Sequence, residues 1–113
     1  MLATGTRVLM CTEPQDMRRS FDRLAAVVRD EMGEQPQSGA FFVFVSKSAT
    51  RVKVLWWDRN GYCLLYKRLH QALFRLPRDA ASVGKTMQVD AMALAKLLEG
   101  VAPERVEKQP RMH

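Results

Sequence analysis

The stretch that decides the fold is residues 51–68, RVKVLWWDRNGYCLLYKR. Two runs of apolar, aromatic and β-branched residues flank Asn60-Gly61, and an Asn-Gly pair in this setting is the strongest short-range signal for a β-hairpin. With the turn centred on Asn60-Gly61, we expect residue i to pair with residue 121 − i. Because side chains alternate across a strand, this pairing sorts the residues of both strands onto two faces.

The two faces expected for this hairpin differ in composition. One is almost purely apolar and is predicted to face the core: Val52, Val54, Trp56, Cys63 and Leu65. The other mixes cationic with aromatic and aliphatic side chains: Arg51, Lys53, Leu55, Trp57, Arg59, Tyr62, Leu64, Tyr66 and Arg68. A four-residue loop would give the same sorting, whereas a three-residue loop would not. The second face is therefore expected either to be covered by a helix or to bind a partner.

Upstream of the hairpin, the sequence predicts a strand, a helix and a second strand. Residues 6–11 form the first strand, and Asp16 is placed to cap a helix that begins at Met17. The helix has an apolar stripe with helical spacing, made of Met17, Phe21, Leu24, Val28 and Met32. Residues 41–45, FFVFV, lack alternation, which predicts an interior strand that is covered on both faces.

Downstream of the hairpin, we expect a short strand over residues 73–76, an irregular segment over 78–87, and a helix capped by Asp90 and ended by Gly100. The order of elements predicts an α+β fold: an antiparallel meander sheet with a central β-hairpin, packed by an N-terminal and a C-terminal helix. We expect one domain over residues 1–101 and a disordered polar tail over residues 102–113.

Composition narrows the class of protein. The 113 residues are 47% hydrophobic, enough for one core, and the longest wholly apolar run, residues 40–45, is too short to span a bilayer. The N-terminus lacks the order of regions found in a signal peptide, so we expect a cytoplasmic protein with no membrane partner. Cys11 and Cys63 are far apart and His70 and His113 are the only histidines, so we expect buried free thiols and no metal.

Positive charge is concentrated in one region of the chain. The formal net charge is +6, and residues 51–75 contribute six basic residues against one acidic residue, or +5 of this total. A basic balance gathered on one element suggests a partner rich in phosphate. The acidic residues are few and scattered, and the chain has neither a Gly-rich phosphate loop nor a serine in a nucleophile motif. We therefore expect no enzymatic activity and no cofactor.

The cationic residues of the second hairpin face are interleaved with aromatic ones, which suits nucleic acid. We expect Arg51, Lys53, Arg59 and Arg68 to contact phosphates, and Trp57 and Tyr66 to pack against sugar or base. Arg18, Arg19 and Arg23 form a second basic cluster, on the first helix. Two alternatives remain open. A helix covers this face while the cationic groups reach solvent at its edge, or the face is a protein interface anchored by Trp57, Tyr62 and Leu64.

Several motifs give the chain a family resemblance. In order, they are VLMC at 8–11, DMRRSFDRL at 16–24, FVF at 42–44, VLWWD at 54–58 followed by Gly61, YKRL at 66–69 and LLEG at 97–100. Together they resemble the small accessory protein encoded by the second reading frame of the insertion-sequence-66 group of bacterial transposable elements. The resemblance covers residues 7–101. The chain departs from it in the nearly neutral loop 46–50, at Leu76 and at His70.

The resemblance implies a role in transposition beside a separate, larger transposase that carries the cutting and joining chemistry, and it supplies no catalytic residues. We therefore expect a non-enzymatic DNA-binding accessory factor in DNA recombination. The partners expected are DNA at the element ends, the transposase and a second copy of the chain. The residues expected to bind DNA are Arg18, Arg19, Arg51, Lys53, Trp57, Arg59, Tyr66, Lys67 and Arg68. The alternative is an adaptor that binds the transposase or itself without touching DNA.

Overall fold

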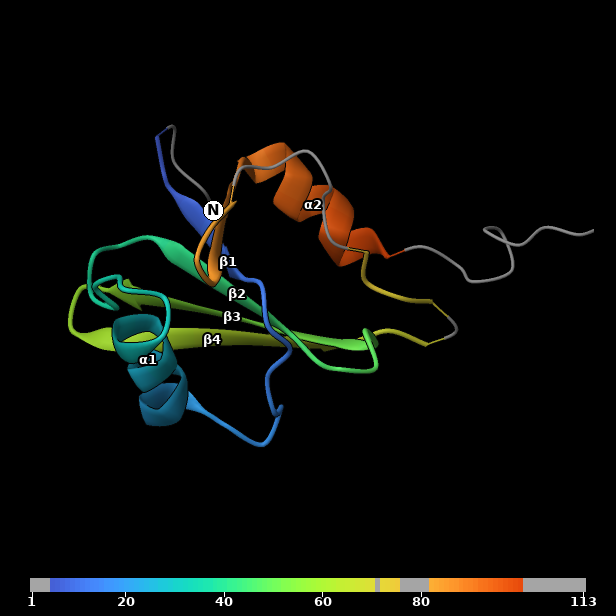
Figure 1. Ribbon diagram of the computed structural model, residues 1–113, viewed down its shortest axis with the longest axis horizontal. Helices are drawn as coiled ribbons and strands as arrows, with labels where there is room; N and C mark the ends of the chain where they lie inside the picture. The colour runs from blue at the N-terminus through green and yellow to red at the C-terminus, as the bar shows by residue number, and fades with distance from the viewer. Residues whose placement is uncertain (1–4, 71, 76–81, 101–113) are drawn as a thin grey trace, which may run out of the picture.

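The structure, a computed structural model, describes residues 5–70, 72–75 and 82–100. The elements are β1 (Val8–Cys11), α1 (Phe21–Asp30), β2 (Phe41–Val45), β3 (Arg51–Asp58), β4 (Gly61–Arg68), β5 (Ser82–Val83), β6 (Thr86–Val89) and α2 (Ala91–Glu99) (Figure 1). The strands form one sheet in the order β4-β3-β2-β1-β6-β5. The α+β class is therefore confirmed.

The sheet is mixed, so the expectation of an antiparallel meander is wrong. β1 and β2 run parallel, with Val8 opposite Phe41, whereas the other neighbouring strands are antiparallel. The chain passes from β1 through α1 to β2, and such a crossover returns the second strand in the direction of the first. The hairpin is also not central: β4 is the outermost strand on its side of the sheet. The centre is occupied by β2, whose five residues are all buried, which confirms it as an interior strand.

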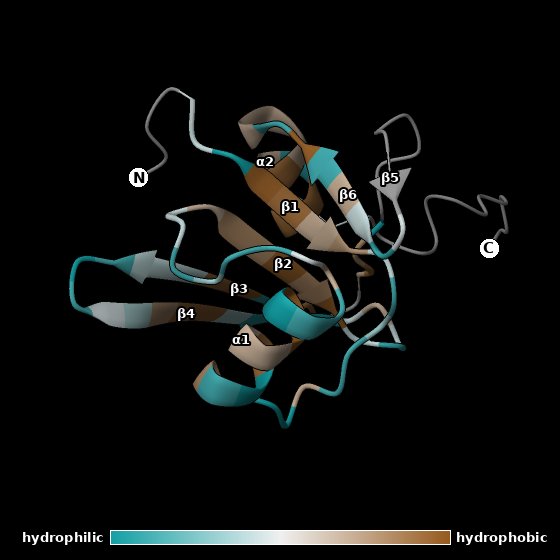
Figure 2. Cartoon of the chain, turned by 60° about the vertical axis from the view of Figure 1, so that its left-hand side comes forward, coloured by the Kyte–Doolittle hydropathy of each residue, from teal (hydrophilic) through white to brown (hydrophobic). Residues whose placement is uncertain are grey.

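Each face of the sheet is covered by one helix (Figure 1). On one face, Leu94 and Leu97 of α2 pack with Val43 and Val54. On the other, Leu24 and Val28 of α1 pack with a different set of strand residues: Leu9, Phe42, Phe44 and Leu55. Figure 2 shows the hydrophobic strands β1 and β2 between the two helices. The α1 helix therefore covers part of the face that the sequence left open for a function.

The hairpin is confirmed, but its expected register is wrong by two residues. Asp58 pairs with Gly61 and Arg51 with Arg68, so the loop is Arg59-Asn60 rather than Asn60-Gly61. Arg59 takes the left-handed conformation of this loop, with φ of 59°. The observed register places apolar side chains opposite one another, as at Trp57 and Tyr62, whose rings meet edge to face with centroids 5.0 Å apart. Because both registers pair odd with even residues, the sorting of side chains onto two faces is unchanged.

The first helix begins later than the sequence predicts. It starts at Phe21, with Ser20 at the N-cap position, and Asp16 does not cap it. The Asp16 carboxylate instead accepts hydrogen bonds from the backbone and side chain of Arg18, which holds residues 16–18 in a turn. Of the expected stripe, Leu24, Val28 and Met32 are buried, whereas Phe21 is 43% exposed.

The C-terminal part differs from the expectation in its strands. The segment 78–87, expected to be irregular, contains β5 and the first half of β6, and β6 pairs with β1. The predicted strand at 73–76 is absent from the described part of the chain, where Leu73 makes only an isolated bridge. Asp90 caps α2 as predicted, since its carboxylate accepts a hydrogen bond of 2.7 Å from the amide of Ala93. The expected tail, 102–113, lies outside the described residues.

The two cysteines are free, as predicted. Cys11 is buried, and this burial raises the pKa of its thiol. Cys63 is only half-buried, so the expectation of burial holds for one of the two. Within the described residues, neither helix has the length and apolar character needed to cross a bilayer.

Gly100, which ends α2 as predicted, should be costly to replace. Its φ is 77°, and a Cβ there would lie 2.5 Å from Cδ1 of Leu69. We expect Gly100→Ala to lower the free energy of unfolding by about 1–2 kcal/mol, from the backbone conformation together with the contact. Gly39→Ala is the matched control, because Gly39 has φ of 93° and open space around it. Equal losses for the two variants in urea unfolding would contradict a contribution from Leu69.

Candidate functional site

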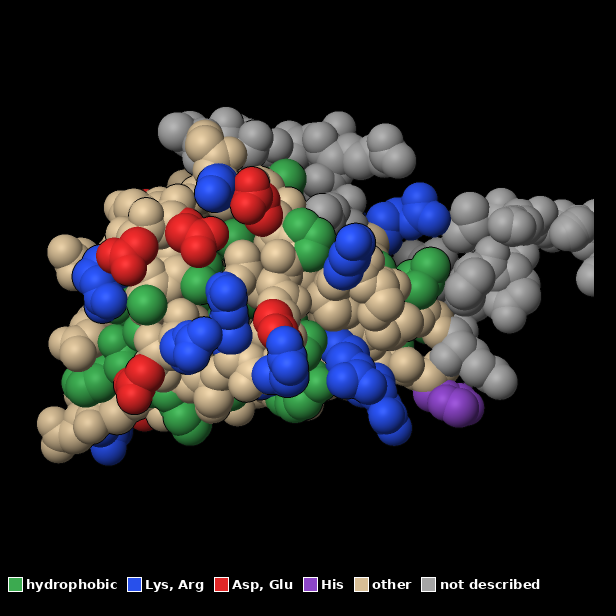
Figure 3. Space-filling view, turned by 60° about the horizontal axis from the view of Figure 1, so that its bottom comes forward, with side chains coloured by type: hydrophobic (Ala, Val, Ile, Leu, Met, Phe, Trp, Pro, Cys, Tyr) green, Lys and Arg blue, Asp and Glu red, His purple; other side chains and the backbone are tan. Residues whose placement is uncertain are grey.

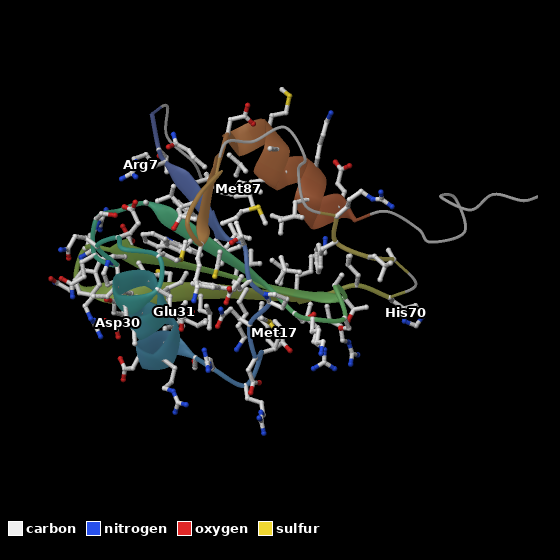
Figure 4. All side chains as sticks on the ribbon, viewed as in Figure 1. Arg7, Met17, Asp30, Glu31, His70 and Met87 are labelled. Carbon is white, nitrogen blue, oxygen red and sulfur yellow. The ribbon has the colours of Figure 1, made fainter. Side chains whose placement is uncertain are left out.

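A groove of about 610 Å³ lies where the segment before α1, the β2–β3 loop and one end of the hairpin meet. In Figure 4, Met17 marks its position beneath the hairpin, and His70 marks the end of the hairpin opposite the turn. The groove contains three basic side chains, three hydroxyl side chains and one aromatic ring: Arg18, Lys47, Arg51, Ser46, Ser48, Thr50 and Tyr66. We call it the basic groove. It joins segments that are far apart in the sequence.

Two arginines face each other beside the basic groove. Arg51 of β3 lies directly opposite Arg68 of β4, and alternation places both on the side of the sheet that α1 covers. Both are exposed, and neither forms an ion pair with any described residue. Like charges directly opposite each other across two strands are destabilising. The Arg51 guanidinium donates a hydrogen bond of 3.4 Å to the hydroxyl of Tyr66, and an anion bound by both arginines would relieve their repulsion.

The β2–β3 loop adds hydroxyl groups to the same groove. Its turn is closed by a hydrogen bond of 2.9 Å from the amide of Ala49 to the carbonyl of Ser46, and Ala49 has φ of 62°. Ser48 and Thr50 are linked by their hydroxyls at 2.7 Å, and Ser46 Oγ accepts a hydrogen bond from the amide of Arg51. Hydroxyls at this position can donate to phosphate oxygens. Neither these hydroxyls nor Lys47 is among the predicted site residues, although a Ser- and Thr-rich loop directly before Arg51 is a usable signal.

The expectation that Lys53 projects from an exposed face is wrong. Its residue exposure is 5%, and its ammonium donates a hydrogen bond of 2.6 Å to the carbonyl oxygen of Arg19. The same ammonium lies 4.7 Å from the ring centroid of Tyr66. Lys53 therefore ties the segment before α1 to the hairpin and supports the Tyr66 ring.

Arg18 lines the basic groove, but its positive charge is partly offset by the carboxylate of Asp16. Its side chain is 91% exposed and forms an ion pair of 2.7 Å with Asp16. Hydrogen bonds from the side chain and backbone of Arg18 hold the pKa of Asp16 well below its usual range. The carboxylate therefore stays ionised at neutral and mildly acidic pH, so the basic groove contains one permanent negative charge.

A smaller hollow of about 320 Å³ adjoins the basic groove and extends the cationic surface toward α1. Asp16 and Arg18 line both depressions, and Arg19 and Arg23 complete the smaller one. Arg19 is held by a hydrogen bond of 2.9 Å to the side-chain oxygen of Gln15. Figure 3, which brings this side of the molecule forward, shows Lys and Arg side chains across the whole face, whereas most Asp and Glu lie on its left half.

Three of the residues predicted to bind DNA lie away from the groove. Trp57 and Arg59 are at the turn end of the hairpin, which an eight-residue strand places roughly 26 Å from the groove end. Lys67 points to the other face of the sheet, where its ammonium donates a hydrogen bond of 2.7 Å to the carbonyl of Leu98 in α2. The structure thus brings Arg18, Arg51 and Tyr66 together in the groove, with Arg19 and Arg68 beside them.

The described residues show no metal centre. Within residues 5–70, 72–75 and 82–100, no three His, Cys, Asp or Glu side chains come close enough together to hold a metal ion.

Comparison with known proteins gives one family and two relatives. A family model described as "IS66 Orf2 like protein" matches residues 6–108. "Uncharacterized protein y4hO" of Sinorhizobium fredii is 35% identical over 103 residues, covering 89% of this chain and 87% of the relative. "Uncharacterized protein y4jC" of the same organism is 30% identical over 108 residues, covering 94% and 88%. No solved structure matches the chain significantly.

Proposed function

The chain belongs to the IS66 Orf2-like family, and from its transposition-associated accessory role we propose that it acts by binding DNA at the basic groove. The family membership predicted from the motifs is thereby confirmed. The role at the level of residues is our proposal: the protein holds DNA of the element for a separate transposase and performs no cutting or joining itself.

One observation carries the proposal: Arg51 and Arg68 face each other without an acidic partner in the described residues, at the rim of a groove rich in hydroxyls. A phosphodiester between the two guanidinium groups turns a repulsive pair into two attractive contacts. The hydroxyls of the β2–β3 loop are placed to donate to the remaining phosphate oxygens. Backbone contacts of this kind position a protein on DNA without reading its sequence.

Tyr66 and Arg18 add to this contact surface. The Tyr66 ring is 50% exposed and lies over the Lys53 ammonium, so one side of the ring is fixed by the protein and the rest is open to a sugar or base. Arg18 and Arg19 extend the contact along the strand. Trp57 and Arg59 stay predictions and would meet only a duplex that runs along the hairpin. We leave Lys53 and Lys67 out of the contact set.

The proposal is tested by measuring the affinity of the full chain for labelled duplex DNA over a series of salt concentrations. Each phosphate contact contributes about 0.9 to the slope of log K against log salt, so contacts by Arg19, Arg51 and Arg68 give a slope of about −2.7, while the charge of Arg18 is offset by Asp16. Duplexes with element ends and duplexes of random sequence should share this slope, and a difference in affinity between them would reveal base readout. Undetectable binding at low salt would refute the proposal.

Neutralising Asp16 should increase DNA affinity. Asp16→Asn removes the charge that offsets Arg18, so we expect affinity to rise a few-fold and the salt slope to steepen by up to about 0.9. Asp58→Asn is the matched control, because it removes one exposed carboxylate at the turn end of the hairpin. A rise of the same size in both variants would show a general effect of net charge and not one of the groove.

A second candidate, an adaptor that binds the transposase without DNA contact, is favoured by one feature. Trp57 and Tyr62 form an edge-to-face pair near the tip of the hairpin, and both are only half-buried. Aromatic side chains of this kind are frequent anchors of interfaces. Co-purification with the transposase that survives nuclease treatment and is lost in Trp57→Ala would support the adaptor, whereas a groove-dependent salt slope would favour DNA binding.

A further inference from the structure

β4 forms one edge of the described sheet. β4 is eight residues long and, among the residues that the structure describes, has only β3 as a neighbouring strand, whereas the opposite edge strand, β5, has two residues. A short edge strand can form few hydrogen bonds with another chain, whereas a long edge strand is a template for pairing. The two edges are therefore unequal, and only that of β4 is long enough to accept a partner strand.

The hairpin geometry decides which groups point outward. In a two-residue hairpin the pair next to the loop, Asp58 and Gly61, is hydrogen-bonded, and hydrogen-bonded pairs then alternate along the ladder. The bond of 2.8 Å from the amide of Leu69 to the carbonyl of Thr50 agrees with this alternation. The even-numbered residues of β4 thus direct their N–H and C=O groups away from β3: Tyr62, Leu64, Tyr66 and Arg68.

The usual devices that protect an edge are scarce along β4. Residues 61–68 contain no proline, and the eight consecutive pairs with β3 leave no bulge. The only charged side chains, Lys67 and Arg68, lie at one end of the strand. Natural sheets avoid edge pairing by prolines, bulges and charges near the middle of the edge. Residues 61–66 contain no proline, bulge or charge, so this part of the edge is free to pair with another strand.

We propose that β4 pairs with β4 of a second copy of this chain, antiparallel and about a two-fold axis at Leu65. Charge selects the direction. A parallel pair would place Lys67 and Arg68 beside the same residues of the other copy, whereas an antiparallel pair moves them to opposite ends. The arrangement is self-complementary, as a two-fold interface requires.

Charge and side-chain type also select the register. Outward-facing residues must meet outward-facing residues, so the axis lies at residue 63, 64 or 65 near the strand centre. An axis at Cys63 would set Lys67 against Arg59 of the other copy, and an axis at Leu64 would set Arg68 against Asn60 of the turn, where it meets no aromatic ring. An axis at Leu65 sets Arg68 against Tyr62 and Leu64 against Tyr66. Each of these pairs combines an aromatic ring with a cation or an aliphatic group, and both combinations are favourable.

This interface has a consequence for the surface of the dimer. A two-fold axis perpendicular to the sheet keeps α1 of both copies on the same side, so both basic grooves would open on one face. The two Arg68 residues would be six residues apart along the paired strands, or about 20 Å. This spacing is shorter than one turn of duplex DNA, about 34 Å. The dimer itself does not depend on DNA binding.

The first test is the oligomeric state of the full chain, measured by sedimentation over a wide range of concentrations, at high salt and after nuclease treatment. We expect a dimer under these conditions, in which a nucleic-acid bridge is excluded. A monomer at every concentration would overturn the proposal. Because the measurement involves no DNA, its outcome is separate from that of the salt series.

The second test fixes the register by disulfide formation. In an antiparallel pair, residues at a non-hydrogen-bonded position have Cα atoms about 4.5 Å apart, within the range of a disulfide. Leu65→Cys combined with Cys63→Ser should therefore cross-link two copies under mild oxidation, while the buried Cys11 stays unreactive. The wild-type chain is the control: Cys63 would face Lys67 of the other copy and should not cross-link. A variant that does not cross-link, whether or not the wild type does, would overturn the axis at Leu65.

Discussion

Replacing Lys53 with glutamate is expected to unfold the protein. The Lys53 ammonium is buried against the carbonyl oxygen of Arg19 at 2.6 Å and the face of the Tyr66 ring at 4.7 Å, so both of its neighbours are electron-rich. A carboxylate at this position would meet no hydrogen-bond donor from either of them. An uncompensated buried charge costs about 3–5 kcal/mol, which is comparable to the whole stability of a small domain.

The matched control is Lys53→Met, which keeps the apolar stem and removes only the ammonium. We expect it to remain folded and to lose about 1–3 kcal/mol, since the carbonyl of Arg19 loses a buried partner. Chemical denaturation followed by circular dichroism measures both variants. A Lys53→Glu chain that unfolds at the same denaturant concentration as wild type would contradict the buried contact.

Lys53→Met also separates the two roles considered for this residue. A lysine that held a phosphate would take about 0.9 from the salt slope of DNA binding when removed. Since Lys53 donates to the protein's own backbone, we expect its loss to leave the slope unchanged. Tyr66 loses the support of the ammonium in this variant, so we expect the affinity to fall slightly while the slope stays the same.

The hairpin was predictable because its signals are local. The alternation of side chains and the turn residues fixed which residues share a face, and this sorting holds in the structure even though the pairing shifted by two residues. The shift arose because turn composition alone favours a loop at Asn60-Gly61, whereas the observed loop is Arg59-Asn60. The pairing of Trp57 with Tyr62 and of Leu55 with Leu64 selects the observed register, and such pair energies require the two strands to be compared together.

The basic groove and the covering helix were not predictable in the same way. Arg18, Thr50 and Tyr66 meet only because α1 crosses from β1 to β2 and packs under the hairpin. The parallel pairing of β1 with β2 sets this geometry. In the sequence, the only feature that indicates this pairing is the order strand, helix, strand. The burial of Lys53 follows from the same packing, so a lysine in an alternating pattern was read as exposed.

Replacing Arg51 with glutamate should weaken DNA binding without weakening the fold. The variant removes one phosphate contact and sets a carboxylate opposite Arg68, which neutralises a second. Near 0.1 M salt each lost contact costs about tenfold, so we expect the affinity to fall about 100-fold and the slope to flatten by up to about 1.8. The new pair of opposite charges across the strands is worth about 0.2–1 kcal/mol, so the free energy of unfolding should stay equal or rise.

DNA affinity and folding stability are expected to change in opposite directions in Arg51→Glu, which separates a loss of binding from a loss of folding. A variant that loses binding because it misfolds must lose stability, whereas Arg51→Glu is expected to lose affinity alone. Lys96→Glu is the control for net charge, because it reverses one exposed cation on α2, on the other side of the sheet. We expect it to leave the salt slope unchanged and to reduce affinity only slightly. If both variants lowered affinity equally, DNA would be held by the overall positive charge, and the facing arginines would have no special part in binding it.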